Sequence, residues 1–139
     1  MENCIFCKIV RGEVNSWKVY EDEHTIALLD INPLSEYHTI VIPKAHYVNA
    51  LDAPSDVFLH VMNTAKHVID LYTNKLWLKN LQILHNAGSA AGQEVFHLHV
   101  HIVPRNTGDK QIFNWKTHPR MRENFDEMLA QLTRKELYT

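Results

Sequence analysis

Cysteine, glycine and long apolar runs are all scarce in this chain. Only two cysteines and four glycines occur among its 139 residues, so the core has to form without a set of disulfides. No apolar run approaches the roughly 18 to 20 residues that span a bilayer, and the N-terminus lacks the basic and apolar regions of a signal peptide. A cytoplasmic protein without a membrane partner is therefore expected.

An excess of charge of one sign is also lacking. The chain carries 14 basic and 16 acidic side chains, a formal net charge of −2, and its basic residues do not cluster. This balance argues against nucleic acid or an anionic membrane surface as the main partner. A small anionic ligand remains possible, because it requires only local hydrogen-bond donors.

The length suits one domain, and no repeat, low-complexity tract or Gly/Ser linker divides the sequence. We expect a single domain over 1–139, with 106–139 as a C-terminal tail that contains a helix. Alternation predicts strands and 3.6-residue spacing predicts helices. The expected strands cover 17–20, 25–29, 39–42, 81–85 and about 97–102, and the expected helices cover about 55–72 and 121–132.

This order, β-β-β-α-β-β-α, has no regular βαβ alternation. It predicts an α+β fold with a mostly antiparallel five-stranded sheet and two helices. Asp52 or Ser55 is expected to cap the first of these helices, because Asp and Ser side chains accept hydrogen bonds from the first free backbone N–H groups.

The run from Phe96 to Arg105, F-H-L-H-V-H-I-V-P-R, is the most informative part of the sequence. Side chains alternate between the two faces of a strand. Three histidines therefore share one face and three aliphatic residues share the other. The aliphatic row would anchor the strand in a core, which leaves the imidazoles facing a groove, a partner or water. The histidines are His97, His99 and His101, and the aliphatic residues are Leu98, Val100 and Ile102.

Such a row of imidazoles suits phosphate chemistry better than a single metal site. The outer two lie about 13 Å apart along a strand, whereas the ligand atoms of one tetrahedral zinc lie about 3 to 3.5 Å apart. At least one ring is therefore left for other work. With a pKa of about 6.5, one imidazole can attack phosphorus while another donates hydrogen bonds to its oxygens. The alternative is a polar sheet face without chemistry.

The run resembles the histidine triad (HIT) motif, His-φ-His-φ-His-φ-φ with φ apolar. The resemblance extends from Cys4 to about Arg105 through I-F-C-K-I-V, L-L-D-I-N-P, H-T-I-V-I-P-K-x-H and N-A-G-S-A-A-G-Q. These segments stand in the order and spacing of the Hint-like branch of that family.

The resemblance implies a homodimer in which the sheets of two subunits join. It also implies hydrolysis or transfer of nucleoside monophosphates at the α-phosphate, with adenosine phosphoramidates and dinucleoside polyphosphates among the substrates. A purine nucleotide is then the expected small-molecule partner. The middle histidine, His99, would be the nucleophile and would form a covalent nucleotidyl-imidazole that water cleaves.

The resemblance also assigns roles to the other histidines. The backbone carbonyl of His97 would hold the Nδ1 proton of His99, His101 would bind the phosphate oxygens, and His38 would support the cluster. For His38, a surface histidine at the start of a strand is the alternative.

Three further groups match binding segments of the family. The loop residues Asn86, Gly92 and Gln93 would bind phosphate, with amide donation from the Asn86 and Gln93 side chains, although such residues also simply form turns. Asp30 would accept the ribose hydroxyls, or would be a turn former before Asn-Pro. The base pocket would be lined by Ile5, Phe6, Ile9, Val14, Leu28, Ile31 and Ile40, for which core packing is an equally good explanation.

The C-x-x-C pair resembles a zinc-bearing subset of the family, in which the matching ligands here are Cys4, Cys7, His46 and His97. Two sulfurs and two nitrogens suit a closed, structural tetrahedral Zn²⁺ site. The alternatives are two reduced cysteines in a core and, with less support, a redox pair.

The sequence departs from the family at Glu94, where Ser or Thr is usual. A carboxylate facing the site would repel a polyphosphate; otherwise it turns outward or donates a proton to an amine leaving group. The competing hypothesis is therefore a nucleotide-binding or interaction protein with little turnover. In the tail, Trp115 would approach a neighbouring subunit's site, or would be a packed surface aromatic.

Overall fold

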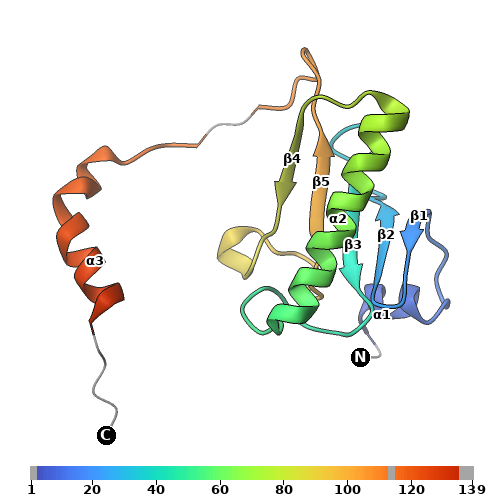
Figure 1. Ribbon diagram of the computed structural model, residues 1–139, viewed down its shortest axis with the longest axis horizontal. Coiled ribbons are helices and arrows are strands. Elements are labelled where there is room, and N and C mark those ends of the chain that lie inside the picture. Colours follow the sequence, from blue (N-terminus) through green and yellow to red (C-terminus); the bar gives the residue numbers. More distant parts are fainter. Residues whose placement is uncertain (1–2, 113–114, 135–139) are drawn as a thin grey trace, which may run out of the picture. The chain divides into compact units, whose positions relative to one another are not determined.

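The computed structural model describes residues 3–112 and 115–134. The chain divides into two compact units, one ending at Asp109 and one beginning at Lys110, and each is described by itself (Figure 1). In the described residues, no helix combines the length and the apolarity that are needed to cross a bilayer.

The first unit is built on one five-stranded sheet. Its strands lie in the order β1-β2-β3-β5-β4, and every neighbouring pair is antiparallel. The expected α+β class with a mostly antiparallel five-stranded sheet is confirmed. The strands are β1 (Lys18–Glu21), β2 (Thr25–Leu29), β3 (Thr39–Pro43), β4 (Leu81–Leu84) and β5 (Val100–Pro104).

Helix α2 (Ser55–Leu76) covers one face of this sheet (Figure 1). Its Val61 and Val68 are fully buried against a core that includes Val41 and Val100 of the central strands. The prediction of its cap was wrong. The N-cap is Pro54, which makes no side-chain hydrogen bond, and the Asp52 carboxylate instead accepts hydrogen bonds from backbone N–H groups in the preceding loop.

A short helix that the sequence pattern did not predict, α1 (Ile5–Val10), packs on the opposite face. Phe6 and Ile9 of this helix join Ile40 in a second core, whereas the next residue along β3, Val41, belongs to the core under α2. With six residues, α1 is too short to show helical periodicity. Its start is fixed by Cys4, whose sulfur accepts a hydrogen bond from the backbone N–H of Cys7.

The histidine-rich run is only partly a strand. Strand β5 begins at Val100, so His97 and His99 precede it and only His101 lies within it. The aliphatic row is confirmed, because Leu98, Val100 and Ile102 are fully buried. The imidazoles do not share one environment: His97 is fully buried as well.

The second unit contains the helix expected near the C-terminus, in two parts. A 3₁₀ turn over Pro119–Asn124 leads into α3 (Phe125–Thr133). Pro119 stands at the start of the 3₁₀ turn, where its missing N–H group costs no hydrogen bond.

Candidate active site and metal cluster

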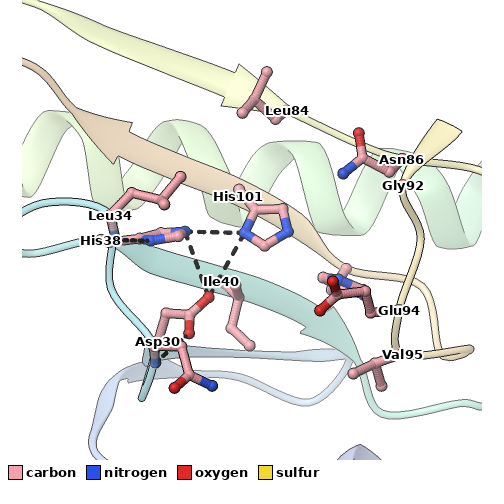
Figure 2. A pocket seen from close by; sticks show the side chains of 12 residues that line it. Asp30, Leu34, His38, Ile40, Leu84, Asn86, Gly92, Glu94, Val95 and His101 are labelled. Atoms are coloured by element: carbon pink, nitrogen blue, oxygen red, sulfur yellow. Dashed lines mark hydrogen bonds and ion pairs between the residues drawn. The ribbon is translucent and has the colours of Figure 1, made fainter. Parts of the chain in front are cut away.

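Three side chains from different segments converge on the face of the sheet opposite α2. His38 Nε2 lies 2.9 Å from His101 Nδ1, and the Asp30 carboxylate lies 3.5 Å from the first and 3.7 Å from the second. Figure 2 shows the carboxylate beneath the two rings. Antiparallel pairing of β3 with β5 sets His101 opposite Ile40, which brings His38, two residues earlier, to the same end of the site.

The backbone fixes the tautomers of this pair. The N–H of Leu34 donates to His38 Nδ1 over 2.9 Å, so the proton of neutral His38 is on Nε2 and points to His101 Nδ1. His101 accepts it and carries its own proton on Nε2. His38 is 3% exposed, which excludes the surface histidine that was its alternative.

His99 is held in the opposite tautomer, with a free Nε2. Its Nδ1 lies 2.7 Å from the backbone carbonyl of His97, as expected, and therefore donates a proton to it. His99 is 9% exposed, and its ring meets Phe6 edge-on at 5.2 Å between centroids. An unprotonated Nε2 on a ring that cannot rotate freely is a suitable nucleophile.

Burial keeps these imidazoles neutral. It lowers the pKa of His101 to about 4, with neighbouring His99 and His38 acting in the same direction and Asp30 opposing them. It also lowers the pKa of His99, although the hydrogen bond to the His97 carbonyl opposes the shift. At neutral pH both rings are uncharged, so His99 has its lone pair available.

A cavity of about 300 Å³ opens over this cluster. His99 and His101 line it together with Asp30 on one side and Glu94 on the other (Figure 2). From the loop that precedes β5, Asn86 and Gly92 also line the cavity, whereas Gln93 does not. Phosphate binding by Asn86 and Gly92 stays a prediction.

The prediction that Gln93 donates to a phosphate was wrong for its side chain. Gln93 is 5% exposed, and its Nε2 donates to the backbone carbonyls of Val48 (2.7 Å) and Val95 (3.0 Å). Its Oε1 accepts from the Gly88 N–H and from the Asn49 side chain. Both amide hydrogens of Gln93 are thus used in hydrogen bonds to backbone carbonyls. The buried side chain stabilises the 86–93 loop.

A second, mostly apolar cavity of about 200 Å³ adjoins the first. The two share Asp30, Ile40 and Val95 among their lining residues. Every residue that the family resemblance assigned to a base pocket lines it: Ile5, Phe6, Ile9, Val14, Leu28, Ile31 and Ile40. Four of these residues also pack in the second core, so their side chains both fill the core and line the cavity. They are Phe6, Ile9, Leu28 and Ile40.

Asp30 lies at the junction of these cavities. The structure shows the turn-forming role that was one of its two interpretations, and the ribose-binding role stays a prediction. Its Oδ1 accepts a hydrogen bond from the Asn32 N–H over 2.8 Å, which makes it a turn former. Its Oδ2 faces the His38–His101 pair.

The two cysteines form a separate cluster with two histidines. Ligand atoms of Cys4, Cys7, His46 and His97 all lie within 4.8 Å of one another. The His97 Nδ1 is 3.3 Å from the Cys4 sulfur and 3.0 Å from His46 Nδ1, and Cys7 Sγ is 3.2 Å from His46 Nδ1. These separations match the spacing of ligands around one tetrahedral zinc, about 3 to 3.5 Å.

The second nitrogen of His97 supports metal binding by the first. Nε2 lies 2.9 Å from the Pro43 carbonyl and donates to it, so Nδ1 is unprotonated and faces the sulfurs. Burial raises the pKa of the Cys7 thiol, as does neighbouring Cys4, which shows that two uncompensated thiolates are unfavourable there. The donor set and its spacing fit Zn²⁺. His97 does not line the active-site cavity; its backbone carbonyl accepts the hydrogen bond from His99 Nδ1.

His85 was missed by the sequence analysis. Its Nδ1 donates to the His99 carbonyl over 3.0 Å, because its Nε2 accepts from the Ala50 N–H over the same distance. The residue links the loop before α2 to the segment that carries His99. Its only sequence signal was its position directly before the Asn86 loop.

The comparison with known proteins decides the family. The HIT domain family model matches residues 11–108, most of the first unit. The chain belongs to the HIT family. The resemblance read from the histidine motif is confirmed, and Cys4 and Cys7 lie outside the matched residues.

HIT relatives span nearly the whole chain. It is 40% identical over 129 residues to an uncharacterized HIT-like protein of Methanocaldococcus jannaschii, covering 93% of this chain and 98% of the other. It is 38% identical over 107 residues to the adenylylsulfatase HINT3 of Arabidopsis thaliana, covering 77% of this chain and 54% of that protein.

Solved HIT structures match the fold. A HIT family protein from Bacillus anthracis has a TM-score of 0.87 at 34% identity, covering 94% of this chain and 95% of its own. A Zn-bound histidine triad protein from Mycobacterium smegmatis has a TM-score of 0.76 at 35% identity, covering 94% and 96%. A HIT family hydrolase from Clostridium thermocellum has a TM-score of 0.70 at 36% identity, covering 81% and 99%.

Proposed function

We propose that this HIT protein is a nucleotidyl hydrolase or transferase that acts at the α-phosphate of AMP-type conjugates, with His99 as the nucleophile. The observation that carries the proposal is the joining of two cavities at Asp30. A purine fits the apolar cavity, the ribose hydroxyls fit the Asp30 carboxylate, and the phosphate then lies over His99 and His101.

The reaction would proceed through two displacements. His99 Nε2 bonds to phosphorus while the bond from phosphorus to the leaving group breaks, and the leaving group takes a proton from solvent as it departs. Water then attacks phosphorus and loses a proton to solvent, the P–N bond to His99 breaks with its electrons returning to Nε2, and AMP is released. His99 Nδ1 keeps its proton and its hydrogen bond to the His97 carbonyl throughout, so the ring returns to the same tautomer.

His101 and the loop would bind the phosphate oxygens. The hydrogen bonds from Leu34 N–H to His38 and from His38 to His101 leave a proton on His101 Nε2. Figure 2 shows this ring at the wall of the cavity. Asn86 and Gly92 line the same space, and the Asn86 amide supplies a further donor.

We also propose that the cluster of Cys4, Cys7, His46 and His97 holds a structural Zn²⁺. When bound, the metal would neutralise the thiolates and link α1 to the segment before β5; four protein ligands leave no position for substrate. The Zn-bound relative from Mycobacterium smegmatis supports this assignment.

The relatives support hydrolysis as the class of reaction. An adenylylsulfatase and a HIT family hydrolase are among them. A homodimer stays a prediction: β4 is an edge strand whose outer hydrogen-bonding groups could pair with a second copy. Sedimentation equilibrium checks it, with a mass twice that of the chain as the expected result.

The competing hypothesis is a nucleotide-binding or interaction protein with little turnover, which Glu94 at the cavity favours. The two are separated by mixing the protein with an adenosine phosphoramidate, quenching in base and searching by mass spectrometry for an AMP adduct on the peptide that contains His99. An adduct and released AMP are expected, and His99→Ala should show neither while keeping its circular dichroism spectrum. Binding without adduct or product would support the competing hypothesis.

A further inference from the structure

We propose that Glu94 selects the leaving group, favouring amines that carry a positive charge or none and disfavouring anionic groups such as phosphates. This inference rests on the proposed nucleotidyl transfer and adds to it the chemical class of the second half of the substrate.

The position of Glu94 between two cavities is the first observation. Glu94 and Val95 line both the active-site cavity and a third cavity of about 700 Å³. Figure 2 shows the Glu94 carboxylate directed towards the active-site cavity, on a residue that is also exposed to solvent. The third cavity also shares Ile5 and Val95 with the apolar cavity. With the base in the apolar cavity, the space beside Glu94 is the part of the third cavity that we assign to the group that leaves phosphorus.

The charge around the phosphate position is the second observation. Among the described residues, no lysine or arginine lines either the active-site cavity or the third cavity. Asp30 and Glu94 supply two carboxylates, while burial lowers the pKa of His99 and His101 and keeps those rings uncharged at neutral pH. A polyphosphate leaving group would therefore add negative charge to a negatively charged site without a counterion.

The lining of the third cavity indicates what the rest of the leaving group resembles. Ile5, Val48 and Phe96 give it an apolar wall, and Phe96 is 48% exposed. Asn3 and two members of the cysteine–histidine cluster, Cys4 and His46, line the rest. An amine with an aliphatic or aromatic body fits this wall, and a cationic substituent on it pairs with Glu94. The surface is too apolar to solvate a chain of phosphates.

The test compares three AMP phosphoramidates whose amines have the same length and differ in charge. They are the conjugates of 1,4-diaminobutane (terminal ammonium), n-butylamine (no charge) and 4-aminobutyrate (terminal carboxylate). A unit charge about 6 Å from the Glu94 carboxylate changes kcat/KM roughly tenfold at an effective dielectric of about 40. We expect the order cationic, neutral, anionic, with roughly a hundredfold span from first to last.

Two variants at Glu94 assign this order to the carboxylate. Glu94→Gln should reduce the cationic-to-anionic ratio of kcat/KM to near one, and Glu94→Lys should invert it. The matched control is Glu23→Gln, which removes the same charge from an exposed side chain that lines neither cavity. It should keep the wild-type ratio.

The outcomes separate this inference from the proposed function. If no conjugate yields AMP or an adduct on His99, the proposed function fails. If all three conjugates are cleaved with a ratio that Glu94→Gln leaves unchanged, nucleotidyl transfer stands and the selection by Glu94 is wrong. A wild-type preference for the anionic conjugate would overturn the inference in the same way.

Discussion

The histidines of this protein differ in which ring nitrogen carries the proton, and the hydrogen-bond partner of each ring decides it. His97 donates Nε2–H to the Pro43 carbonyl, and its unprotonated Nδ1 faces the sulfurs of Cys4 and Cys7. His99 gives Nδ1–H to a carbonyl and keeps Nε2 bare over the cavity. His101 is left with a proton on Nε2 because His38 donates to its Nδ1. Each tautomer is thus set by a single hydrogen bond.

His38→Ala tests whether the hydrogen bond from His38 sets the tautomer of His101. Without the donor on His38 Nε2, His101 can take either tautomer and loses one hydrogen bond in a buried site, which typically costs about 1 to 3 kcal/mol. We expect kcat/KM for an AMP phosphoramidate to fall roughly tenfold to a hundredfold. Nitrogen NMR shifts of the His101 ring should report the mixed tautomers directly.

The control for this variant is His67→Ala, because His67 is an exposed histidine of α2 that lines none of the site cavities. It should leave the rate unchanged. A His38→Ala protein with wild-type activity and a single His101 tautomer would contradict this role. It would show that Leu34 and His38 do not control which nitrogen of His101 donates a hydrogen bond to the phosphate.

At the scale of elements, two contacts hold loops and a short helix against the sheet. Gln93 links the 86–93 loop to the segment before α2 through Val48 and Asn49. The cysteines link α1 to the segment before β5 through His97. Both links join parts of the chain that are distant in sequence, so each removes freedom from a segment without much regular structure of its own.

Gln93→Glu tests the first link with nearly the same shape. A carboxylate cannot donate to the Val48 and Val95 carbonyls, and a buried polar group without its partners costs about 1 to 3 kcal/mol or more when charged. We expect the melting temperature to fall by several degrees and amide exchange in 86–93 to accelerate. Gln131→Glu, on the exposed surface of α3, is the control. Unchanged exchange in the loop would contradict the bracing role.

Cys4→Ser tests the second link. Serine is a weaker ligand for Zn²⁺, and in a closed structural site metal affinity contributes directly to folding. We expect the zinc content per chain, measured by mass spectrometry of the metal, and the melting temperature to fall together. A chelator should lower the wild type to the level of the variant and leave the variant itself unchanged. Equal metal content in both proteins would remove Cys4 from the ligand set.

At the scale of the whole molecule, burial of neutral histidines makes stability depend on pH. Burial lowers the pKa of His101 from 6.5 to about 4 in the folded chain, and likewise that of His97. Their stabilising contribution is present above pH 6.5, and it is lost as the pH falls towards 4, because the unfolded chain binds protons that the folded chain does not. His97 would add to the effect as the proposed ligand of Zn²⁺, since its protonation would also release the metal.

Urea unfolding between about pH 7.5 and about pH 5 measures this dependence. Each buried histidine should lower the free energy of unfolding by up to about 1.4 kcal/mol per pH unit below about pH 6.5. His101→Ala should show a smaller slope than wild type. A free energy of unfolding that stays level down to pH 5 would mean that these rings are protonated in the folded chain without cost.

The sequence by itself determined the sheet and the family. Alternation and turn residues placed all five strands within a few residues, because these signals are local to each segment. The spacing of His97, His99 and His101 identified the motif, and the family model confirmed it. The spacing also showed that three rings on one segment are too far apart for one ion, which left at least one of them for other chemistry.

Only the tertiary structure decided what each side chain faces. Gln93 turns inward because Val48 and Asn49, more than forty residues away in sequence, offer partners there. The six residues of α1 are helical because Phe6 and Ile9 pack against the sheet. Glu94 points towards a cavity that, in the part of the chain that the structure describes, no lysine or arginine lines. Such outcomes depend on long-range contacts between segments, whereas periodicity reports only how one segment alternates.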